Sequence, residues 1–361
     1  MLLVAGAVLL VAGADLLVRG ASRLALAIGI PPLVIGLTVV AFGTSAPELA
    51  VVVGAVRSGE ADVALGNVLG SNIFNLLFIL GLSAAITPIV VAGQLVRLDV
   101  PLMIGASFLV GGLALDGTIG RFDGAVLFAG MLAYTGFLIR CGRRREASRL
   151  AGLGERPPAD RGVRSHVLSV LLVVAGLVLL VVGARWLVSG AVTLAQALGA
   201  SNLVIGLTIV AAGTSLPEVA TSVLASIKGA RDIAIGNIVG SNLFNLLAVM
   251  GLGGLVAPAG IAVPPGALTF DVPIMIASAV AVLPVVFTGY LIARWEGLVL
   301  LAYYGFYTTY LVLEAADHPA LSAFTSAMVY FVLPLAAMTL AVVTVRALRG
   351  RQGRRHRTSS D

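Results

Sequence analysis

Two glutamates stand inside apolar sequence of membrane-spanning length, each at the end of the same short motif. Glu48 ends the motif Gly-Thr-Ser-Ala-Pro-Glu, and Glu218 ends the motif Gly-Thr-Ser-Leu-Pro-Glu. A carboxylate at mid-membrane depth is energetically costly and is rarely kept without a function. Two carboxylates in matching settings therefore predict one shared site for a cation.

Hydroxyl groups precede each glutamate at helical spacing. Thr44 and Ser45 lie four and three residues before Glu48, and Thr214 and Ser215 precede the second glutamate in the same way. These spacings place the side chains on one helical face. Taken singly, such hydroxyls most simply bond to their own helix backbone. An internal ion pair is the corresponding alternative for the glutamates, but the interiors of the motif helices contain no Lys or Arg.

A proline stands directly before each glutamate and should interrupt the helix. Pro47 and Pro217 each lack a backbone donor and disturb the preceding turn. Carbonyls near Gly43 and Gly213 then lose their helical partners, which a membrane tolerates only where protein, water or an ion replaces them. A broken helix with free carbonyls is a known way to hold Na⁺ at the membrane midplane.

A second duplicated motif carries amides and hydroxyls. Asn67, Ser71 and Asn75 recur every four residues within 66–75, and the same pattern recurs within 236–245. Helix packing through small residues and amide hydrogen bonds is the simpler explanation for the glycines. The two motifs together offer only hard oxygen donors, which favour Ca²⁺ or Na⁺ over Zn²⁺ or Cu⁺.

The composition identifies the class of protein that must position these groups. Of 361 residues, 59% are hydrophobic and 11% are charged, against about 25% charged in a soluble domain. The runs are apolar without alternation, which favours an all-α polytopic membrane protein over a β-barrel. Eleven spans are predicted, at 1–19, 31–56, 62–87, 98–115, 122–141, 166–188, 202–227, 232–257, 271–289, 295–314 and 322–347. Met1–Val18 lacks a basic start and is interpreted as the first span, not as a signal peptide.

The two halves of the chain repeat over five spans each. Gly43 matches Gly213, and at the same offset of 170 residues Gly13-Ala14 matches Gly183-Ala184. Because five is odd, the second copy must start on the opposite side of the membrane, which predicts an inverted repeat. The predicted organisation has five parts: an N-terminal repeat (1–141, motif region 33–82), a basic linker (142–165), a C-terminal repeat (166–314, motif region 203–252), an additional span (315–347) and a basic tail (348–361).

The charge distribution predicts the orientation. The net charge is +6, but the arginines cluster between and after apolar segments, which is the positive-inside pattern and not a nucleic-acid surface. With the linker in the cytoplasm, most basic residues near the spans fall inside: Arg19, Arg23, Arg97, Lys228, Arg231 and Arg294. Arg57, Arg121 and Arg185 are mild exceptions. A multi-pass protein of the cytoplasmic membrane is expected.

Other chemistry has little support in the sequence. Cys141 is the single cysteine, and the three histidines have no metal-ligand spacing. No Gly-x4-Gly-Lys-Ser/Thr loop is present, so no ATP site is expected. Asp99 and Asp271 stand before Val-Pro and are interpreted as helix N-terminal residues, and Asp15 and Arg185 occupy equivalent repeat positions. No enzymatic activity and no cofactor are predicted.

The two motifs, each present twice, resemble the α-repeats of the cation/Ca²⁺ exchanger superfamily, specifically its prokaryotic Na⁺/Ca²⁺ exchangers. The resemblance covers spans one to ten and implies a central site formed by spans two, three, seven and eight, past which spans one and six slide. It implies that Ca²⁺ is bound by Glu48 and Glu218, with backbone oxygen from Thr44 and Thr214. The implied Na⁺ ligands are Ser45, Ser215, Ser71, Ser241 and the carbonyls of Ala41 and Ala211. Asn75 and Asn245 would complete the middle of the site.

Differences from related families indicate which ion is coupled to Ca²⁺ transport. K⁺-dependent relatives carry Asp where this chain has Asn245, and an amide cannot supply that charge. H⁺-coupled relatives typically replace the Gly-Thr-Ser-x-Pro stretch with a Gly-Asn-Ala type of sequence. The short linker has no room for the large Ca²⁺-sensing domains of animal exchangers.

The sequence therefore predicts a secondary antiporter that exchanges Na⁺ for Ca²⁺ in the lipid bilayer, acting as a monomer and without nucleic acid. Two alternatives stay open: an H⁺-coupled Ca²⁺ or Mn²⁺ antiporter and, in a different class, a passive cation channel. A channel pore is more often built from a ring of repeated subunits, so the inverted repeat favours alternating access. An intramembrane enzyme has no paired aspartates or Ser–His pair to support it.

Overall fold

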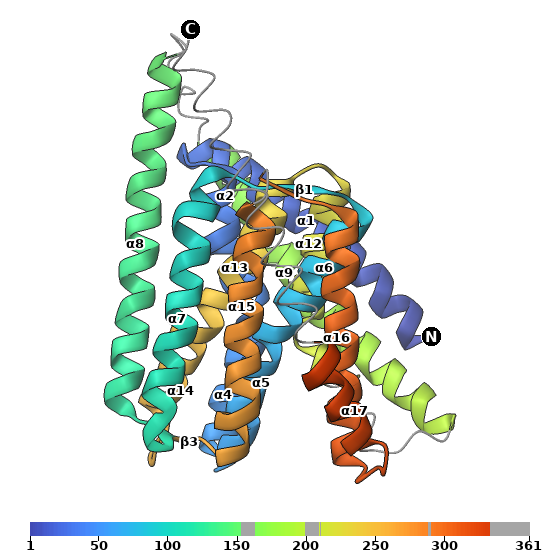
Figure 1. Cartoon of the computed structure of the whole chain (residues 1–361). Helices are drawn as coiled ribbons and strands as arrows, with labels where there is room; N and C mark the ends of the chain where they lie inside the picture. Colours follow the sequence, from blue (N-terminus) through green and yellow to red (C-terminus); the bar gives the residue numbers. More distant parts are fainter. Residues whose placement is uncertain (153–162, 199–208, 210, 288–289, 333–361) are drawn as a thin grey trace, which may run out of the picture.

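The computed structural model describes residues 1–152, 163–198, 209, 211–287 and 290–332, and these form a bundle of membrane-length helices (Figure 1). Among them, eight helices are long and apolar enough to cross a membrane, and a bent pair, Pro32–Thr44 with Ala46–Arg57, forms a ninth span. The predicted spans 202–227 and 322–347 lie partly outside the described residues. The count of eleven stays a prediction, whereas the all-helical membrane fold is confirmed.

The first half contains the following elements: α1 (Leu2–Ile28), α2 (Pro32–Ile35), π-helix η1 (Gly36–Val40), α3 (Ala41–Thr44), α4 (Ala46–Arg57), α5 (Ala61–Ile73), π-helix η2 (Phe74–Ile79), α6 (Leu80–Ile86), β1 (Ile89–Val90), π-helix η3 (Leu95–Asp99), α7 (Val100–Leu113), 3₁₀-helix η4 (Ala114–Asp116), β2 (Thr118–Ile119) and α8 (Arg121–Gly152).

The second half contains α9 (Val163–Ala197), α11 (Ala211–Gly213), α12 (Leu216–Ile227), α13 (Arg231–Phe244), π-helix η6 (Asn245–Val249), α14 (Met250–Val256), β3 (Ile261–Ala262), π-helix η7 (Ala267–Asp271), α15 (Val272–Phe287), β4 (Leu291–Ile292), α16 (Arg294–Ala315), α17 (Leu321–Ala327) and π-helix η8 (Met328–Val332).

Three helices are longer than their predicted spans. The first span was predicted to end at residue 19, but α1 continues to Ile28 and ends where Gly29 adopts a left-handed conformation (φ 70°). Helices α8 and α9 extend into the predicted linker from both sides, to Gly152 and from Val163. Arginine is a good helix former, so a basic turn can continue a helix beyond the apolar layer while its side chains remain solvated.

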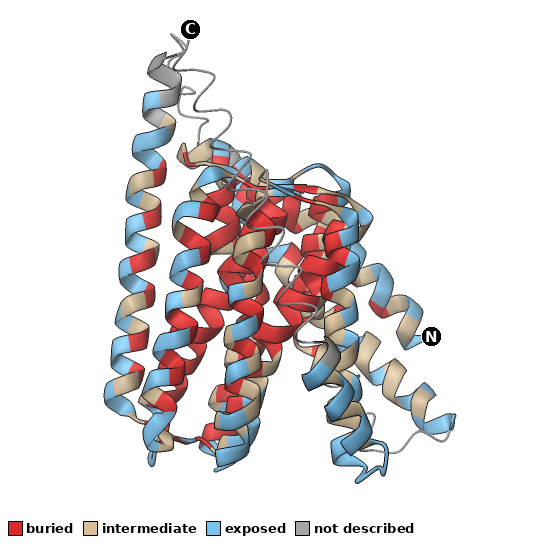
Figure 2. Cartoon of the chain, viewed as in Figure 1, coloured by how far each residue is buried: buried red, intermediate tan, exposed pale blue. Residues whose placement is uncertain are grey.

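The core of the bundle is formed by the helices that carry the duplicated motifs. In the most apolar window of the span Arg231–Val256, 100% of the residues are buried, compared with 6% for Arg294–Ala315. Figure 2 shows the buried residues gathered in the middle of the bundle, while α8 and α16 expose much of their surface. Exposed apolar side chains on α8, such as Phe122, Leu132 and Phe137, suit contact with lipid.

Two short antiparallel ribbons tie the halves together. Strand β1 pairs with β4, so that Ile89 faces Ile292, and β2 pairs with β3, so that Ile119 faces Ile261. Each ribbon joins a strand of the first half to a strand of the second half. In Figure 1 the β1 and β3 labels lie at opposite ends of the bundle, as two halves of opposite orientation require.

Helices α1 and α9 pack as an antiparallel pair through glycines spaced seven residues apart. The glycines are Gly6, Gly13 and Gly20 on α1 and Gly176, Gly183 and Gly190 on α9. A Cβ atom at Gly13 would lie 2.8 Å from both the Gly176 oxygen and the Leu180 nitrogen. The two backbones are therefore in direct contact, as small residues permit in membrane helices.

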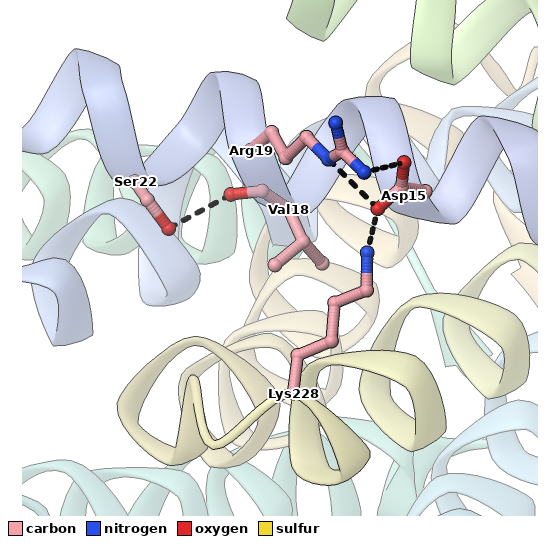
Figure 3. Close-up of polar contacts among 5 residues, drawn as sticks. All are labelled: Asp15, Val18, Arg19, Ser22 and Lys228. Atoms are coloured by element: carbon pink, nitrogen blue, oxygen red, sulfur yellow. Dashed lines mark hydrogen bonds and ion pairs between the residues drawn. The ribbon is translucent and has the colours of Figure 1, made fainter.

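An ion-pair cluster connects α1 to the end of α12 (Figure 3). The Asp15 carboxylate pairs with Arg19 Nη2 at 2.9 Å and also with Lys228 Nζ. Lys228 directly follows the last residue of α12. The position equivalent to Asp15 in the second repeat is Arg185, and the position equivalent to Lys228 in the first is Ser58, so this ion pair has no counterpart in the other half.

Candidate functional site

The helix that carries each motif glutamate is broken, as the prolines predict. Helix α3 ends at Thr44, Ser45 leaves the helical conformation (φ −84°, ψ 8°), and α4 begins at Ala46 with a bend of 44°. In the second half, Ser215 adopts nearly the same conformation (φ −89°, ψ 7°) before α12. Each break places a glutamate in the first turn of a new helix, where the unpaired N–H groups and the dipole favour an anion.

The central contacts are exchanged between the two halves. Ser45 Oγ donates a hydrogen bond to Glu218 Oε1 at 2.8 Å, and Ser215 Oγ donates to Glu48 Oε1 at 2.9 Å. Both carboxylates are buried. Two acidic groups 170 residues apart in sequence are thus brought into one buried cluster.

The threonines next to these serines also bond across the halves. Thr44 Oγ1 donates to Asn237 Oδ1 at 3.1 Å, and Thr214 Oγ1 approaches Asn67 Oδ1 at 3.5 Å. Thr44 also lies 3.4 Å from the Ala41 carbonyl, so its bond to its own helix is the longer one. The expected contact of Thr44 with its own helix is therefore present, but the contact with the other half is shorter.

The predicted serines and asparagines line the same interior. Ser71 Oγ lies 3.3 Å from Ser215 Oγ, which can accept its hydrogen bond because the Ser215 proton is directed to Glu48, and Ser241 is buried. Asn75 lies in the π-helix η2, and Asn245 begins the π-helix η6. A π-turn widens a helix locally and is frequent at functional sites.

Several buried oxygens in this cluster have no hydrogen-bond donor among the described residues. They are Glu48 Oε2, Glu218 Oε2, Ser241 Oγ and the amide oxygens of Asn75 and Asn245. Leaving a buried polar atom without a partner costs about 1–3 kcal/mol, and more for a charged one. A cation can satisfy such oxygens, and all of them are hard donors of the kind that Ca²⁺ and Na⁺ prefer. Among the described residues, neither glutamate forms a salt bridge with a basic side chain.

Two predicted ligands are main-chain carbonyls. The Ala41 carbonyl accepts the Ser45 N–H at 3.0 Å and belongs to the first turn of α3. Ala211 is the first residue of α11. Their role as Na⁺ ligands stays a prediction.

The structure adds residues that the sequence did not assign to the site. Asn67 and Asn237 accept the threonine contacts, and Asn237 Nδ2 donates to Ser222 Oγ at 3.0 Å. The four-residue spacing of Asn67 with Ser71 was a usable signal for the asparagines. Ser222 lies four residues after Glu218, on the same helical face.

The aspartates before the Val-Pro pairs have a different role from the one expected. Asp99 does not begin its helix, because the π-helix η3 already starts at Leu95. Its buried carboxylate instead accepts hydrogen bonds from Tyr134 Oη at 3.1 Å and from Gln94 at 3.2 Å. Asp271 accepts a hydrogen bond from Tyr307 Oη at 3.2 Å, so the same contact occurs in both halves.

Comparison with known proteins agrees with this arrangement. The sequence pattern of the family described as sodium/calcium exchanger protein matches residues 1–140 and 168–313. The chain is 32% identical over 312 residues to the sodium/calcium exchanger MaX1 of Methanosarcina acetivorans, covering 78% of this chain and 89% of the relative. It is 39% identical over 232 residues to the inner membrane protein YrbG of Escherichia coli, covering 64% of this chain and 71% of that relative.

A solved structure shares most of this architecture. The sodium-calcium exchanger NCX_Mj, in a crystal soaked with zero Na⁺ and Ca²⁺, aligns with a TM-score of 0.72 and 30% sequence identity, covering 83% of this chain and 94% of the other. The family pattern spans both halves of the chain and includes both copies of the glutamate motif. The chain therefore belongs to the sodium/calcium exchanger protein family.

Proposed function

We propose that the protein is an antiporter that exchanges Na⁺ for Ca²⁺ across the cytoplasmic membrane by alternating access. One observation carries the proposal: the reciprocal bonds from Ser45 to Glu218 and from Ser215 to Glu48 place one carboxylate from each half in a single buried cluster of oxygens. The family membership and the names of MaX1 and NCX_Mj support Na⁺ and Ca²⁺ as the two transported ions.

The charge of the cluster suits the exchange of one ion type for the other. Two carboxylates can neutralise one Ca²⁺, and the surrounding hydroxyl and amide oxygens can complete its coordination. Several Na⁺ ions can use the same oxygens. Because both substrates need Glu48 and Glu218, the two are mutually exclusive, and this competition couples their fluxes.

The bundle is proposed to lie with its basic end in the cytoplasm. That end carries the end of α8, where Arg143, Arg144 and Arg145 follow one another, and Lys228 at the end of α12. Positive charge near the ends of spans marks the cytoplasmic side. This side of the bundle is the basic end.

Substitution of either glutamate tests the proposal. Glu48→Gln or Glu218→Gln keeps the shape of the side chain and removes one charge. Two unit charges 4 Å apart interact by about 4 kcal/mol at an effective dielectric constant near 20. Removing one carboxylate charge therefore costs a bound divalent ion about twice that amount of electrostatic attraction. Each variant is expected to lose Na⁺-driven Ca²⁺ uptake. Glu60→Gln, at an exposed position before α5, is the matched control.

The assay is Ca²⁺ uptake into proteoliposomes under Na⁺, K⁺ and H⁺ gradients imposed separately. Uptake is expected with the Na⁺ gradient alone. Uptake driven by the pH gradient without Na⁺ would instead identify an H⁺-coupled antiporter, and uptake with no counter-ion at all would identify a channel. Wild-type uptake by either glutamine variant would refute the proposed site.

A further inference from the structure

The part of α12 that follows Glu218 in sequence carries several hydroxyl groups on one face. Thr221, Ser222 and Ser226 follow Glu218 by three, four and eight residues, which places all three on its helical face. All three residues are 0% exposed. Because α12 runs from the broken point at Ser215 to Lys228, these hydroxyls lead from the glutamate cluster toward the basic end.

Two of these hydroxyls have no hydrogen-bond partner. Thr221 Oγ1 and Ser226 Oγ are buried and bond to nothing among the described residues. By contrast, the buried Ser107 on α7 donates to the carbonyl four residues earlier at 2.9 Å. A buried hydroxyl that has no hydrogen-bond partner in the protein is expected to bind one transiently, such as water or a hydrated ion.

The third hydroxyl links the run to the central cluster. Ser222 Oγ accepts a hydrogen bond from Asn237, whose amide oxygen accepts one from Thr44. Thr44 is the direct neighbour of Ser45, which bonds to Glu218. The hydrogen bonds therefore lead from the face of α12 to Thr44, whose sequence neighbour Ser45 bonds to Glu218.

The first repeat has no such face. With the offset of 170 residues, the positions equivalent to Thr221, Ser222 and Ser226 are Val51, Val52 and Val56 on α4. Val52 and Val56 are buried, so the repeat packs with apolar side chains of similar size at these places. Packing does not require the hydroxyls, and their presence in one half alone indicates a function on one side of the membrane.

We propose that Thr221, Ser222, Ser226 and Asn237 form a transit site for the transported cations, between the glutamate cluster and the basic end of the bundle. The proposal rests on the proposed exchange function. Neutral hydroxyl and amide oxygens can replace part of a hydration shell without binding tightly, so an ion can enter and leave. In the described conformation the site is closed, because α1 packs against α12 and Asp15 pairs with Lys228 at its end.

Thiol accessibility tests the transit site without relying on ion flux. Cys141 is the single cysteine, so Cys141→Ala gives a thiol-free background. Thr221→Cys and Ser226→Cys are each exposed, in oriented vesicles, to a membrane-impermeant methanethiosulfonate that carries a quaternary ammonium group. Val56→Cys, the equivalent of Ser226 in the first repeat, is the matched control.

Both test cysteines are expected to react from the basic end about ten-fold faster than Val56→Cys reacts from either side, because thiol reactivity follows access to water. Saturating Na⁺ or Ca²⁺ should slow the reaction. Equal rates at Ser226→Cys and Val56→Cys, or no reaction from the basic end in a variant that still exchanges ions, would overturn the transit site. Labelling in a protein without exchange would instead count against the proposed function alone.

A transport measurement separates transit from a structural role. Thr221→Val or Ser226→Ala removes one neutral oxygen and is expected to raise the apparent KM for Na⁺ and Ca²⁺ by about five-fold at the basic end, with the KM at the opposite side unchanged. Val56→Ala serves as the control. A purely structural role would change both KM values together, and that result would also overturn the proposal.

Discussion

The packing of α1 against α9 makes a quantitative prediction at Gly13. An alanine there would place its Cβ 2.8 Å from the Gly176 oxygen and the Leu180 nitrogen, whereas ordinary contact begins at 3.4 Å, a deficit of 3.4 − 2.8 = 0.6 Å. Both neighbours are backbone atoms and cannot rotate away. The helices must separate or bend, and overpacking of this kind costs about 1–3 kcal/mol.

A matched control removes the contribution of helix propensity. Alanine in place of glycine favours a helix by up to about 1 kcal/mol wherever it is introduced. Gly105 lies inside α7, and a Cβ there meets no described atom within 4 Å. The free energy of unfolding of Gly13→Ala should therefore fall below that of Gly105→Ala by about 1–3 kcal/mol.

The assay is equilibrium unfolding of the purified protein in mild detergent, titrated with a denaturing detergent and followed by far-UV circular dichroism. Gly183→Ala should behave like Gly13→Ala, because its Cβ would lie 2.8 Å from the Leu10 nitrogen. If Gly13→Ala and Gly105→Ala are equally stable, the close backbone contact between α1 and α9 is not present in the folded protein.

Two further predictions concern contacts outside the glutamate cluster. A reducible bifunctional thiol reagent that joins Asp15→Cys to Lys228→Cys should block exchange until it is reduced, because it would fix α1 to the end of α12. Tyr134→Phe removes a hydrogen bond to the buried carboxylate of Asp99 and should lower the free energy of unfolding by about 1.5–3 kcal/mol, measured as above. Tyr307→Phe should cost less, because its aspartate partner is only partly buried.

Each of these two experiments has a specific control. For the cross-link, Gly20→Cys with Leu172→Cys joins α1 to α9, since the Cβ positions are close, and should leave exchange intact if the two helices move together. Exchange that survives the link to Lys228 would mean that α1 does not move against α12. Equal stability of Tyr134→Phe and the wild type would show that the tyrosine bond is not needed to bury Asp99.

The sequence predicted that the two glutamates share one site, because their positions repeat and because a carboxylate buried in the membrane is rarely kept without a function. It did not predict which serine bonds to which glutamate. The three-residue spacing of Ser45 and Glu48 suggests neighbours on one helix, but that argument assumes a continuous helix. The break at Ser45 redirects its hydroxyl to Glu218 in the other half.

Contacts between distant residues explain the other differences. Asp99 gives no local indication that its partner is Tyr134, which lies 35 residues later on a different helix. The span predicted at 1–19 is shorter than α1, because Arg19 pairs with Asp15 on the same helix and the helix continues to Ile28. Periodicity locates helices, but it does not reveal partners supplied by another element.

The exchanged serine bonds have a consequence for how this chain can change over generations. Each half supplies the hydrogen-bond donor that the acidic group of the other half requires, so neither half is self-sufficient as a binding unit. An ancestor of half the length would have needed two copies, inserted in the membrane with opposite orientations, to form the same site. In the fused chain, mutations at Ser45 are tolerated or rejected according to what stands at position 218, so compensating changes should appear across the two gene halves and not within one of them.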